Sequence, residues 1–459
     1  MKTKYVYYAL CSLLLLAAGI QKATGQEPPS LETYSLKNGL KIYFMNYGQI
    51  DAVNISLVIN SGKKNEVPGQ QGFNNLVAEL VLKGNKKYTE DEQNNKAFAV
   101  GSDIESRVSF DYTTLTANCR NTDTEIMFDL MSSAVREPLF KKETISQYLS
   151  YLTSYNTPSK MDVSKQAAVY SALVVYGNEN PLGRSINKDQ LARITEEQVK
   201  TFHQFNYTPG NTRIIVCGKF DPQVIKQQVE TYFGNWQSVY GEVNGVALEK
   251  PEIKKREVYF VNRANATQCA LLWTKTAPSE KDKDAMAFYT ANRIFNLILF
   301  REIREKGGKT YSIGSAYNTS RFSNLFQISC SVRASEMLNT VNLFDKTLAD
   351  FSKAEFSKQG FDNTIIKIKT EVLNNQYPEE VAGFYNPVVY DFNDRKNFLA
   401  KLEKLTQEDV QKVIRKYFTP NVYKLVVSGN EQLVNEQLIS ISGLQKLSPA
   451  NLESAPTGR

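Results

Sequence analysis

The chain has 459 residues and a net charge of +7, and 42% of the residues are apolar, which is enough for two or three domains with complete cores. The charge is mild, and neither an aromatic and basic stripe nor a known nucleic-acid motif accompanies it, so nucleic acid is not an expected ligand. Beyond the N-terminus no apolar run is long enough to span a membrane, so no transmembrane segment is expected.

The N-terminal residues 1–25 predict a signal peptide. Lys2 and Lys4 form the basic start, Tyr5–Ile20 is uncharged and rich in leucine, and Ala23–Gly25 offers small residues before the cleavage point. The uncharged run is shorter than the ~20 residues that a membrane-spanning helix needs. We therefore expect an exported protein of a bacterial-type periplasm.

The first half of the chain predicts a hairpin followed by strands and helices. Asn38-Gly39 is a strong signal for a two-residue hairpin turn. A helix is expected at 71–83, because apolar residues recur there at the spacing of one buried helix face: Phe73, Leu76, Val77, Leu80 and Val81. The other expected elements are strands at 53–60 and 112–119 and helices at 125–134 and 143–153.

The second half predicts a comparable set of elements. The expected strands are 257–260, 269–273, 310–317 and 325–333, and the expected helices are 282–305, 336–353 and 359–375. Strands and helices are grouped and do not alternate strictly. This grouping predicts an α+β fold in which each half forms a mainly antiparallel sheet with helices packed on it.

Two segments match at a fixed offset along the chain and indicate an internal duplication. Thr195 and Thr406 are each predicted to cap a helix, because acidic residues that suit the helix dipole follow both. Each helix leads through Thr-Pro into a β-branched strand that stops at Gly218 or Gly429. We infer two homologous halves. The expected domains are 26–240 and 256–445, joined by a linker at 241–255 and followed by a tail at 446–459.

Four cysteines follow the predicted signal peptide, and each lies in a strand-like run: Cys119, Cys217, Cys269 and Cys330. No two form a C-x-x-C pair, so a zinc or redox site built from them is not expected. Both buried free thiols and disulfides are compatible with an exported protein.

Three motifs in order resemble the insulinase-like (pitrilysin-type) zinc peptidases. Tyr176–Arg184 is similar to that family's Y-G-x-x-x-P-x-G-R segment, and Tyr207–Asn211 is similar to its Y-x-P-x-N turn. The helix at 72–84 resembles the frame of the zinc motif, G-x-x-H-F-x-E-H-x-x-F-K-G. The resemblance covers nearly the whole mature chain and implies a clamshell built from the two halves.

The residues that would bind and use zinc are missing from this frame. The two histidine positions fall on Asn75 and Glu79, and the position of the base glutamate falls on Ala78. The window for the family's third ligand, Leu152–Asn156, contains no acid, and His203 is the only histidine. A catalytic zinc needs three protein ligands. We therefore expect no metal and no cofactor in this chain; taken alone, 72–84 is an ordinary core helix.

The second half keeps another element of the family. Ile303–Ser312 resembles its R-x6-Y segment, which implies that Arg304 and Tyr311 hold substrate carbonyls near the scissile bond. Arginine offers a planar fork of donors, and tyrosine stays a neutral donor at pH 7. Taken without the resemblance, they are a surface arginine and a strand tyrosine.

This pattern predicts the non-metal subunit of a heterodimeric zinc peptidase, inactive alone. A homologous partner subunit with an intact H-x-x-E-H motif would supply Zn²⁺, and the substrate would be a peptide or an unfolded segment. One alternative is a catalytically inert peptide-binding or scaffolding subunit of the core-protein type. Another is a homodimer that only captures peptides.

Overall fold

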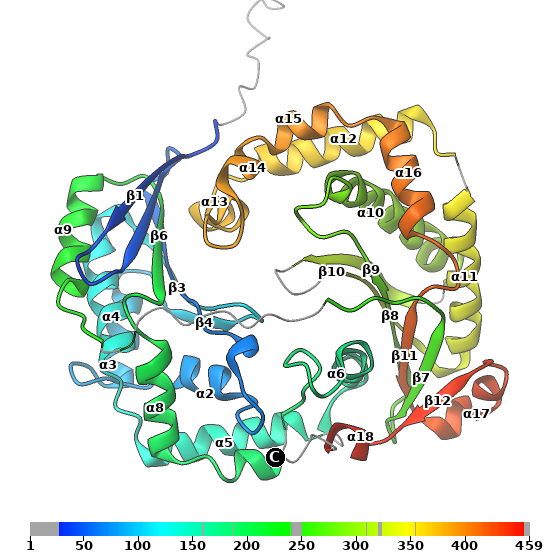
Figure 1. Cartoon of the computed structure of the whole chain (residues 1–459), viewed down its shortest axis with the longest axis horizontal. Coiled ribbons are helices and arrows are strands. Elements are labelled where there is room, and N and C mark those ends of the chain that lie inside the picture. Colours follow the sequence, from blue (N-terminus) through cyan, green and yellow to red (C-terminus); the bar gives the residue numbers. More distant parts are fainter. Residues whose placement is uncertain are drawn as a thin grey trace, which may run out of the picture.

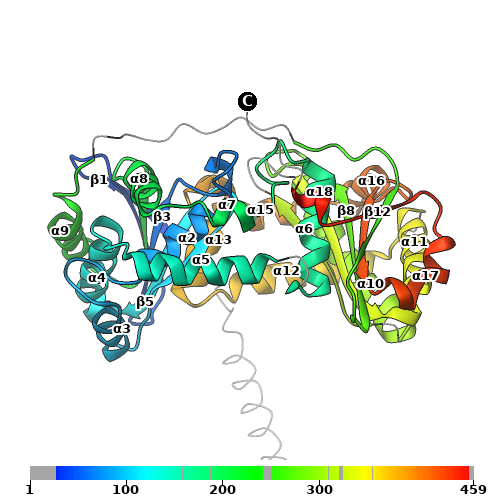
Figure 2. The same cartoon turned by 90° about the horizontal axis from the view of Figure 1, so that it is seen from below.

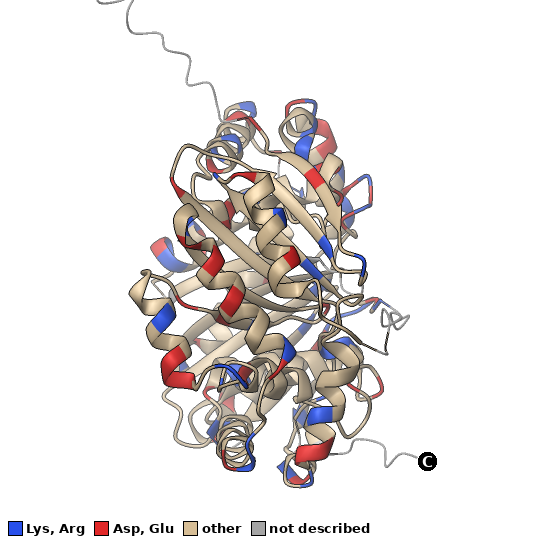
Figure 3. Cartoon of the chain, turned by 90° about the vertical axis from the view of Figure 1, so that its left-hand side faces the viewer, with Lys and Arg blue, Asp and Glu red and all other residues tan. Residues whose placement is uncertain are grey.

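The structure is a computed structural model that describes residues 27–157, 160–186, 188–238, 240, 250–308, 310–319, 324–353 and 355–453. The predicted signal peptide and residues 241–249 of the predicted linker lie outside the described residues. No helix in these ranges is long and apolar enough to cross a membrane. Acidic and basic residues are interspersed over the side of the molecule that Figure 3 shows.

Each half contributes one six-stranded sheet, and the two sheets stand at opposite sides of a central opening (Figure 1). The first sheet has the order β1-β2-β6-β3-β5-β4, with β1 Ser30–Ser35, β2 Lys41–Asn46, β3 Ala52–Ile59, β4 Glu105–Val108, β5 Thr113–Arg120 and β6 Thr212–Gly218. The second has the order β12-β7-β11-β8-β10-β9, with β7 Glu257–Asn262, β8 Gln268–Thr276, β9 Thr310–Thr319, β10 Asn324–Arg333, β11 Lys424–Gly429 and β12 Leu444–Leu447.

The sheets are mixed, although most neighbouring strands are antiparallel, as predicted. The exceptions are β2 with β6 in the first sheet, and β7 with both β11 and β12 in the second. Parallel neighbours need a long crossover connection. In each half that connection contains most of the helices, which explains why the strands appear grouped in the sequence.

Helices cover the outer face of each sheet and bridge the two halves. The first half contains α2 Phe73–Leu80, α3 Glu90–Ala99, α4 Thr124–Arg136, α5 Lys142–Asn156, α6 Val163–Tyr176, α7 Lys188–Leu191, α8 Glu196–Asn206 and α9 Pro222–Phe233. The second contains α10 Ala285–Leu299, α11 Met337–Lys353, α12 Lys358–Leu373, α13 Pro378–Tyr385, α14 Phe392–Lys396, α15 Phe398–Glu403, α16 Gln407–Tyr417, α17 Glu431–Ile439 and α18 Ala450–Glu453. Figure 2 shows α5 running along the first half toward α6.

The predicted duplication is confirmed at the helix caps. Thr195 has φ −103° and ψ 157°, and Thr406 has φ −101° and ψ 157°. Each hydroxyl accepts a hydrogen bond from the backbone N–H three residues on. In return, the backbone N–H of the cap residue donates to the side-chain oxygen of Gln198 or Asp409. Both helices therefore begin with the same reciprocal capping box.

The two glycines that end the matched strands stand where a side chain has no room. A Cβ at Gly218 would lie 2.2 Å from the Ala52 carbonyl oxygen, and Gly218 has φ +133°. A Cβ at Gly429 would lie 2.4 Å from the Sγ of Cys269. Each glycine thus permits close contact with the neighbouring strand, β3 for Gly218 and β8 for Gly429.

The turn at Asn38-Gly39 differs from the two-residue turn that the dipeptide predicts. The N–H of Leu36 donates to the Leu40 carbonyl at 2.9 Å, and only Gly39 has a positive φ, +91°. The Asn38 side chain instead donates to the carbonyl of Phe233 at 2.8 Å. This long-range bond ties the hairpin to the end of α9 and favours a longer turn.

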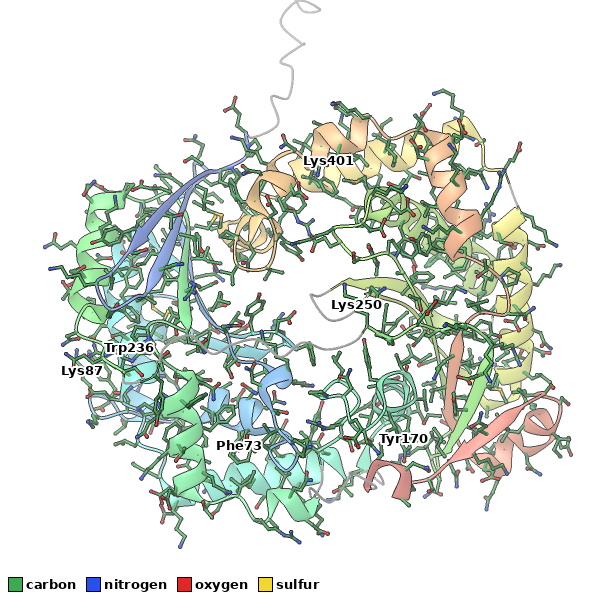
Figure 4. The ribbon with its side chains drawn as sticks, in the orientation of Figure 1. Phe73, Lys87, Tyr170, Trp236, Lys250 and Lys401 are labelled. Carbon is green, nitrogen blue, oxygen red and sulfur yellow. The ribbon has the colours of Figure 1, made fainter. Side chains whose placement is uncertain are left out.

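The inner face of each sheet is covered by a helix from the other half. On α6, Tyr170 is fully buried against the second sheet, where it contacts Val426 among others (labelled in Figure 4). On α13, Val381 and Tyr385 are buried against the first sheet, where they contact Ile215. This exchange of helices joins the halves into one body, in agreement with the clamshell expectation.

The described cysteines are buried and unpaired, namely Cys119, Cys217, Cys269 and Cys330. Burial raises the pKa of Cys269 and Cys330 to about 11 and that of Cys119 and Cys217 to about 12. Of the two alternatives left by the sequence, the structure shows free thiols, and they stay protonated and unreactive at neutral pH.

Candidate functional site

The helix that resembles the zinc motif, α2, begins at a buried polar network. Gly72, in the left-handed conformation with φ +92°, precedes it. The backbone N–H of Asn74 donates to the Glu66 carboxylate at 3.0 Å, and the Asn74 side chain donates to the Gly62 carbonyl at 2.8 Å and accepts from Ser61 at 2.8 Å. Burial raises the pKa of Glu66, while bonds from Gly72 and Asn74 oppose this shift.

The three positions of the lost zinc motif lie on α2 as the register predicts. Ala78 is buried, while Asn75 and Glu79 are half-buried. Glu79 accepts a hydrogen bond from the Ser106 hydroxyl on β4 at 3.0 Å. Among the described residues no three His, Cys, Asp or Glu side chains come together in a way that could hold a metal ion. The side chains present on this helix do not fit a catalytic zinc site.

A stripe of tyrosines on α5 lies in and beside the window where the third ligand would be. The rings of Tyr148 and Tyr151 are 5.6 Å apart, and those of Tyr151 and Tyr155 are stacked at 5.8 Å. Burial, and then the negative charge of Glu79, raises the pKa of Tyr148. The Lys165 ammonium lies over the Tyr155 ring, and burial lowers its pKa to about 8. This region therefore combines tyrosine rings with the Lys165 ammonium and the nearby Glu79 carboxylate.

The single histidine belongs to the core. His203 lies between the rings of Phe140 and Tyr207, and its Nε2 is 2.8 Å from the Val135 carbonyl oxygen. Burial lowers its pKa to about 4. A neutral, fully enclosed imidazole is a structural group and not a metal ligand.

The segment that resembles Y-G-x-x-x-P-x-G-R closes a tight loop after α6. A Cβ at Gly183 would lie 2.1 Å from the Gly177 carbonyl oxygen, which explains the second glycine. The Arg184 guanidinium donates to the carbonyls of Asn178, Glu179 and Glu66 at 3.0, 2.6 and 3.1 Å. Arg184 thereby ties this loop to the segment that precedes α2.

Arg304 stands on an irregular helical segment. The helix expected at 282–305 is α-helical only as far as Leu299, and residues Phe300–Lys306 continue it as a π-helix. Arg304 is exposed, and its guanidinium lies 4.7 Å from the centre of the Phe300 ring. Short π-helical segments are rare and often occur at functional sites.

Tyr311 stands at an irregularity in the neighbouring strand. The pairing of β9 with β10 shifts from Ser312 opposite Ser331 to Thr310 opposite Val332. Tyr311 is therefore the extra residue of a β-bulge. Bulges bend a strand locally. The Tyr311 side chain itself lies outside the described part of the structure. Both residues of the predicted R-x6-Y element thus lie on backbone that departs from regular geometry.

A cavity of about 710 Å³ lies where α6 of the first half faces the second sheet. Its walls include Ala168 and Ala172 on α6, Ala316 on β9 and Ser329 on β10. Phe110, from the loop between β4 and β5, also borders it. These elements surround the central opening in Figure 1. The size and mixed apolar lining are those of a typical ligand pocket.

Comparison with protein families identifies the class. The description "Insulinase (Peptidase family M16)" matches residues 43–190, and "Peptidase M16 inactive domain" matches residues 193–368. The chain belongs to the insulinase-like M16 peptidase family and carries its inactive type of C-terminal domain. Helix α2, with its missing metal ligands, lies in the part that matches the insulinase description.

Individual relatives are distant. An uncharacterised zinc protease, YmxG, of Bacillus subtilis is 21% identical over 360 residues, which are 75% of this chain and 84% of that protein. The mitochondrial-processing peptidase subunit beta of Lentinula edodes is 19% identical over 239 residues, 51% of this chain and 50% of that protein. The crystal structure of a protease from Helicobacter pylori has a TM-score of 0.78 at 17% identity, covering 88% of this chain and all of that one.

Three features of this site escape prediction from the sequence. The π-helical segment and the bulge give no composition signal, although they fall on the predicted Arg304 and Tyr311. The cavity combines segments that lie far apart in the chain. The tyrosine stripe could have been found, because Tyr148, Tyr151 and Tyr155 are spaced to share one side of a helix.

Proposed function

We propose that this chain is the non-metal subunit of a heterodimeric zinc peptidase. A homologous partner subunit with an intact motif would bind the zinc ion, the attacking water and the base. This chain would contribute Arg304 and Tyr311 across the interface as donors to substrate carbonyls. The supporting observation is that both residues lie at local irregularities, a π-helical segment and a β-bulge, in a chain whose own zinc positions are vacant.

The residue types suit the proposed role. An arginine side chain is permanently charged and donates in a fixed plane, and a tyrosine hydroxyl donates without a charge of its own. Donors aimed at a developing oxyanion are worth about 3–4 kcal/mol each in other enzymes. This chain would therefore raise the rate of a reaction that it cannot start alone.

The proposal includes export to a periplasm, on the strength of the signal pattern in residues 1–25. An extended peptide or unfolded segment is the expected substrate. Such a ligand offers a row of backbone carbonyls, which are the groups that the two donors would bind.

The direct test measures turnover of the reconstituted pair with Arg304→Ala. We expect kcat to fall about 100-fold with an unchanged melting temperature, because a donor is lost while the Arg304 side chain is exposed. Arg301→Ala is the matched control, since Arg301 lies on the same π-helical segment and pairs with the adjacent Glu302 at 2.9 Å. Equal turnover of the Arg304 variant and the wild type would remove the proposed role.

A second test concerns the isolated chain. It should not hydrolyse peptides, and adding zinc should change nothing, because Asn75 and Ala78 cannot bind the ion or move a proton. Zinc-dependent hydrolysis by the single chain, stopped by a chelator, would contradict the proposal.

The cavity at α6 favours one alternative, an inert subunit that captures peptides. Purification under native conditions distinguishes the peptidase pair from the peptide-capturing subunit. Recovery of a similar chain with an intact H-x-x-E-H motif supports the peptidase pair. Repeated recovery of this chain without such a partner, together with peptide binding, supports capture.

A further inference from the structure

We propose that the cavity between α6 and the second sheet is a peptide-binding subsite that selects an apolar side chain. This inference rests on the proposed function, because it takes a peptide as the ligand class. It places the selection entirely within this chain, apart from the donors at Arg304 and Tyr311 and from any residue of a partner.

The floor of the cavity is apolar and buried. Leu325 on β10 is 4% exposed, and Leu272 on β8 and Val175 on α6 are half-buried beside it. Burying a large aliphatic or aromatic side chain against such a floor removes apolar surface from water and is therefore favourable. A volume of about 710 Å³ leaves room for a large side chain together with part of its backbone.

Among the described residues that line the cavity, none carries a charged side chain. A charged ligand group would therefore lose its hydration without gaining a partner of opposite sign. The polar lining side chains are neutral: Ser171, whose hydroxyl lies 3.0 Å from that of Thr274, with Tyr176, Gln327 and Ser329. The Ser315 hydroxyl is already engaged, because it donates to Asn292 on α10 at 2.6 Å. Neutral donors and acceptors of this kind suit the amides of a peptide and do not favour a charged ligand.

Small, exposed residues form the rim of the cavity. Ala168, Ala316 and Ser329 are exposed and border the cavity, and all three are small. Small residues at a rim let a peptide backbone approach closely while its side chain enters. This arrangement favours a peptide over a free lipid chain, which would gain nothing from the polar groups at the wall.

The cavity lies on the same strand as the predicted donor. Tyr311 and Gly314 are three residues apart on β9, which corresponds to about 10 Å of strand. An extended peptide advances by a similar length over three residues. A side chain held in the cavity would therefore belong to a residue about three positions from the carbonyl bound near Tyr311.

Gly314 provides a way to fill the cavity without breaking the fold. Its φ is not in the left-handed region, and a Cβ there would meet only Asn296 Oδ1, at 3.9 Å. Gly314→Leu should therefore place a side chain in the cavity at little cost in stability. Gly383→Leu is the matched control, because Gly383 is exposed on α13 and a Cβ there meets no atom within 4 Å.

The test measures binding of two fluorescent hexapeptides to the isolated full chain by anisotropy. The peptides differ only in one central residue, leucine or aspartate. We expect the leucine peptide to bind at least tenfold more tightly. Gly314→Leu should remove that preference, while Gly383→Leu should retain it, and the melting temperatures of both variants should stay at the wild-type value.

Equal binding of the two peptides, or a preference that survives Gly314→Leu, would overturn the inference. Binding of a free fatty acid with no binding of either peptide would also overturn it, since the occupant would then be a lipid. The pair assay with Arg304→Ala reports separately on the proposed function. A lost leucine preference in Gly314→Leu with normal turnover in Arg304→Ala would leave the subsite standing and remove only the proposed peptidase role.

Discussion

The two halves of the molecule close the same turn with different side chains. In the first half, Asn211 is fully buried and donates to the Asn206 carbonyl at 2.7 Å. In the second half, Val422 stands at the matching position, and the ammonium of Lys275 from β8 donates to the carbonyls of Thr419, at 2.8 Å, and Val422. Each half thus satisfies carbonyl groups of the shared turn with a different side chain, and the carbonyls that are bonded differ as well.

The matching helices of the two halves have also diverged. The first-half helix α2 is short and carries the vacant metal positions Asn75, Ala78 and Glu79. The second-half helix α10 is nearly twice as long and continues into the π-helical segment with Arg304. One half thus keeps the place of the metal site without its ligands, and the other keeps the proposed donors. The comparison teaches that a shared fold carries two unequal sites.

The largest expected effect comes from the glycines that end β6 and β11. Gly218→Ala should destabilise the protein by about 4 kcal/mol, because the new Cβ meets a backbone carbonyl and φ is strained. Gly429→Ala should cost about 2 kcal/mol, because its Cβ meets the side chain of Cys269. Urea unfolding of both variants measures the difference.

The two costs have different origins, which a double variant can separate. Cys269→Ala removes the sulfur beside Gly429 and should recover most of the loss in Gly429→Ala. Ala52→Gly should recover little in Gly218→Ala, since the carbonyl oxygen remains. Equal recovery of stability in both double variants would show that the two losses have the same origin.

His203 gives the first half an acid sensitivity that the second half lacks, since Ile414 stands at the matching position. The folded pKa is about 4 and the unfolded value is near 6.5, so the unfolded chain binds more protons between these values. Stability is therefore full above pH 6.5 and falls by about 3 kcal/mol as the pH drops towards 4. Urea midpoints in that range should flatten in His203→Ile, and an unchanged acid loss would contradict this assignment.

Removing the two turn closures should cost similar amounts at neutral pH and differ in their pH dependence. Asn211→Ala should cost about 2 kcal/mol at any pH, because a buried carbonyl loses its donor. Burial lowers the pKa of Lys275 to about 7, against 10.5 unfolded, and Asp345 opposes this shift.

The titration of Lys275 makes the stability of the protein depend on pH. Above pH 7 the unfolded chain binds one more proton, so wild-type stability should rise by about 2 kcal/mol between pH 7 and 9. Lys275→Met should lack that rise, whereas Asn211→Ala should keep it. A Lys275→Met variant with the wild-type slope would show that this lysine is not the titrating group.

The smallest expected effect comes from the two helix caps and should be equal in the two halves. Thr195→Ala and Thr406→Ala should each lower stability by about 1 kcal/mol, since the two caps share their geometry and both lose a bond to the third helical N–H. Chemical unfolding of both variants in parallel measures the two losses. A difference above about 1 kcal/mol would mean that the halves differ in stability as well as in function.

Local patterns in the sequence predict much of the fold. Caps such as Thr406, strand runs and the stop at Gly218 depend on neighbours in the sequence and were readable. The added strand β12, the longer turn at Asn38 and the bulge at Tyr311 depend on groups far along the chain. The same reason hides the cavity, because Ala168 and Ala172 read as ordinary helix residues until β9 and β10 lie opposite them.

The exchange of α6 and α13 makes each half an obligate folding partner of the other. Separated, the first sheet would expose Ile215 and the second would expose Val426, both of which are now covered by the opposite half. Cutting the chain in the segment 241–249 should therefore leave two fragments that stay associated, and their co-expression should restore a native complex without a covalent connection.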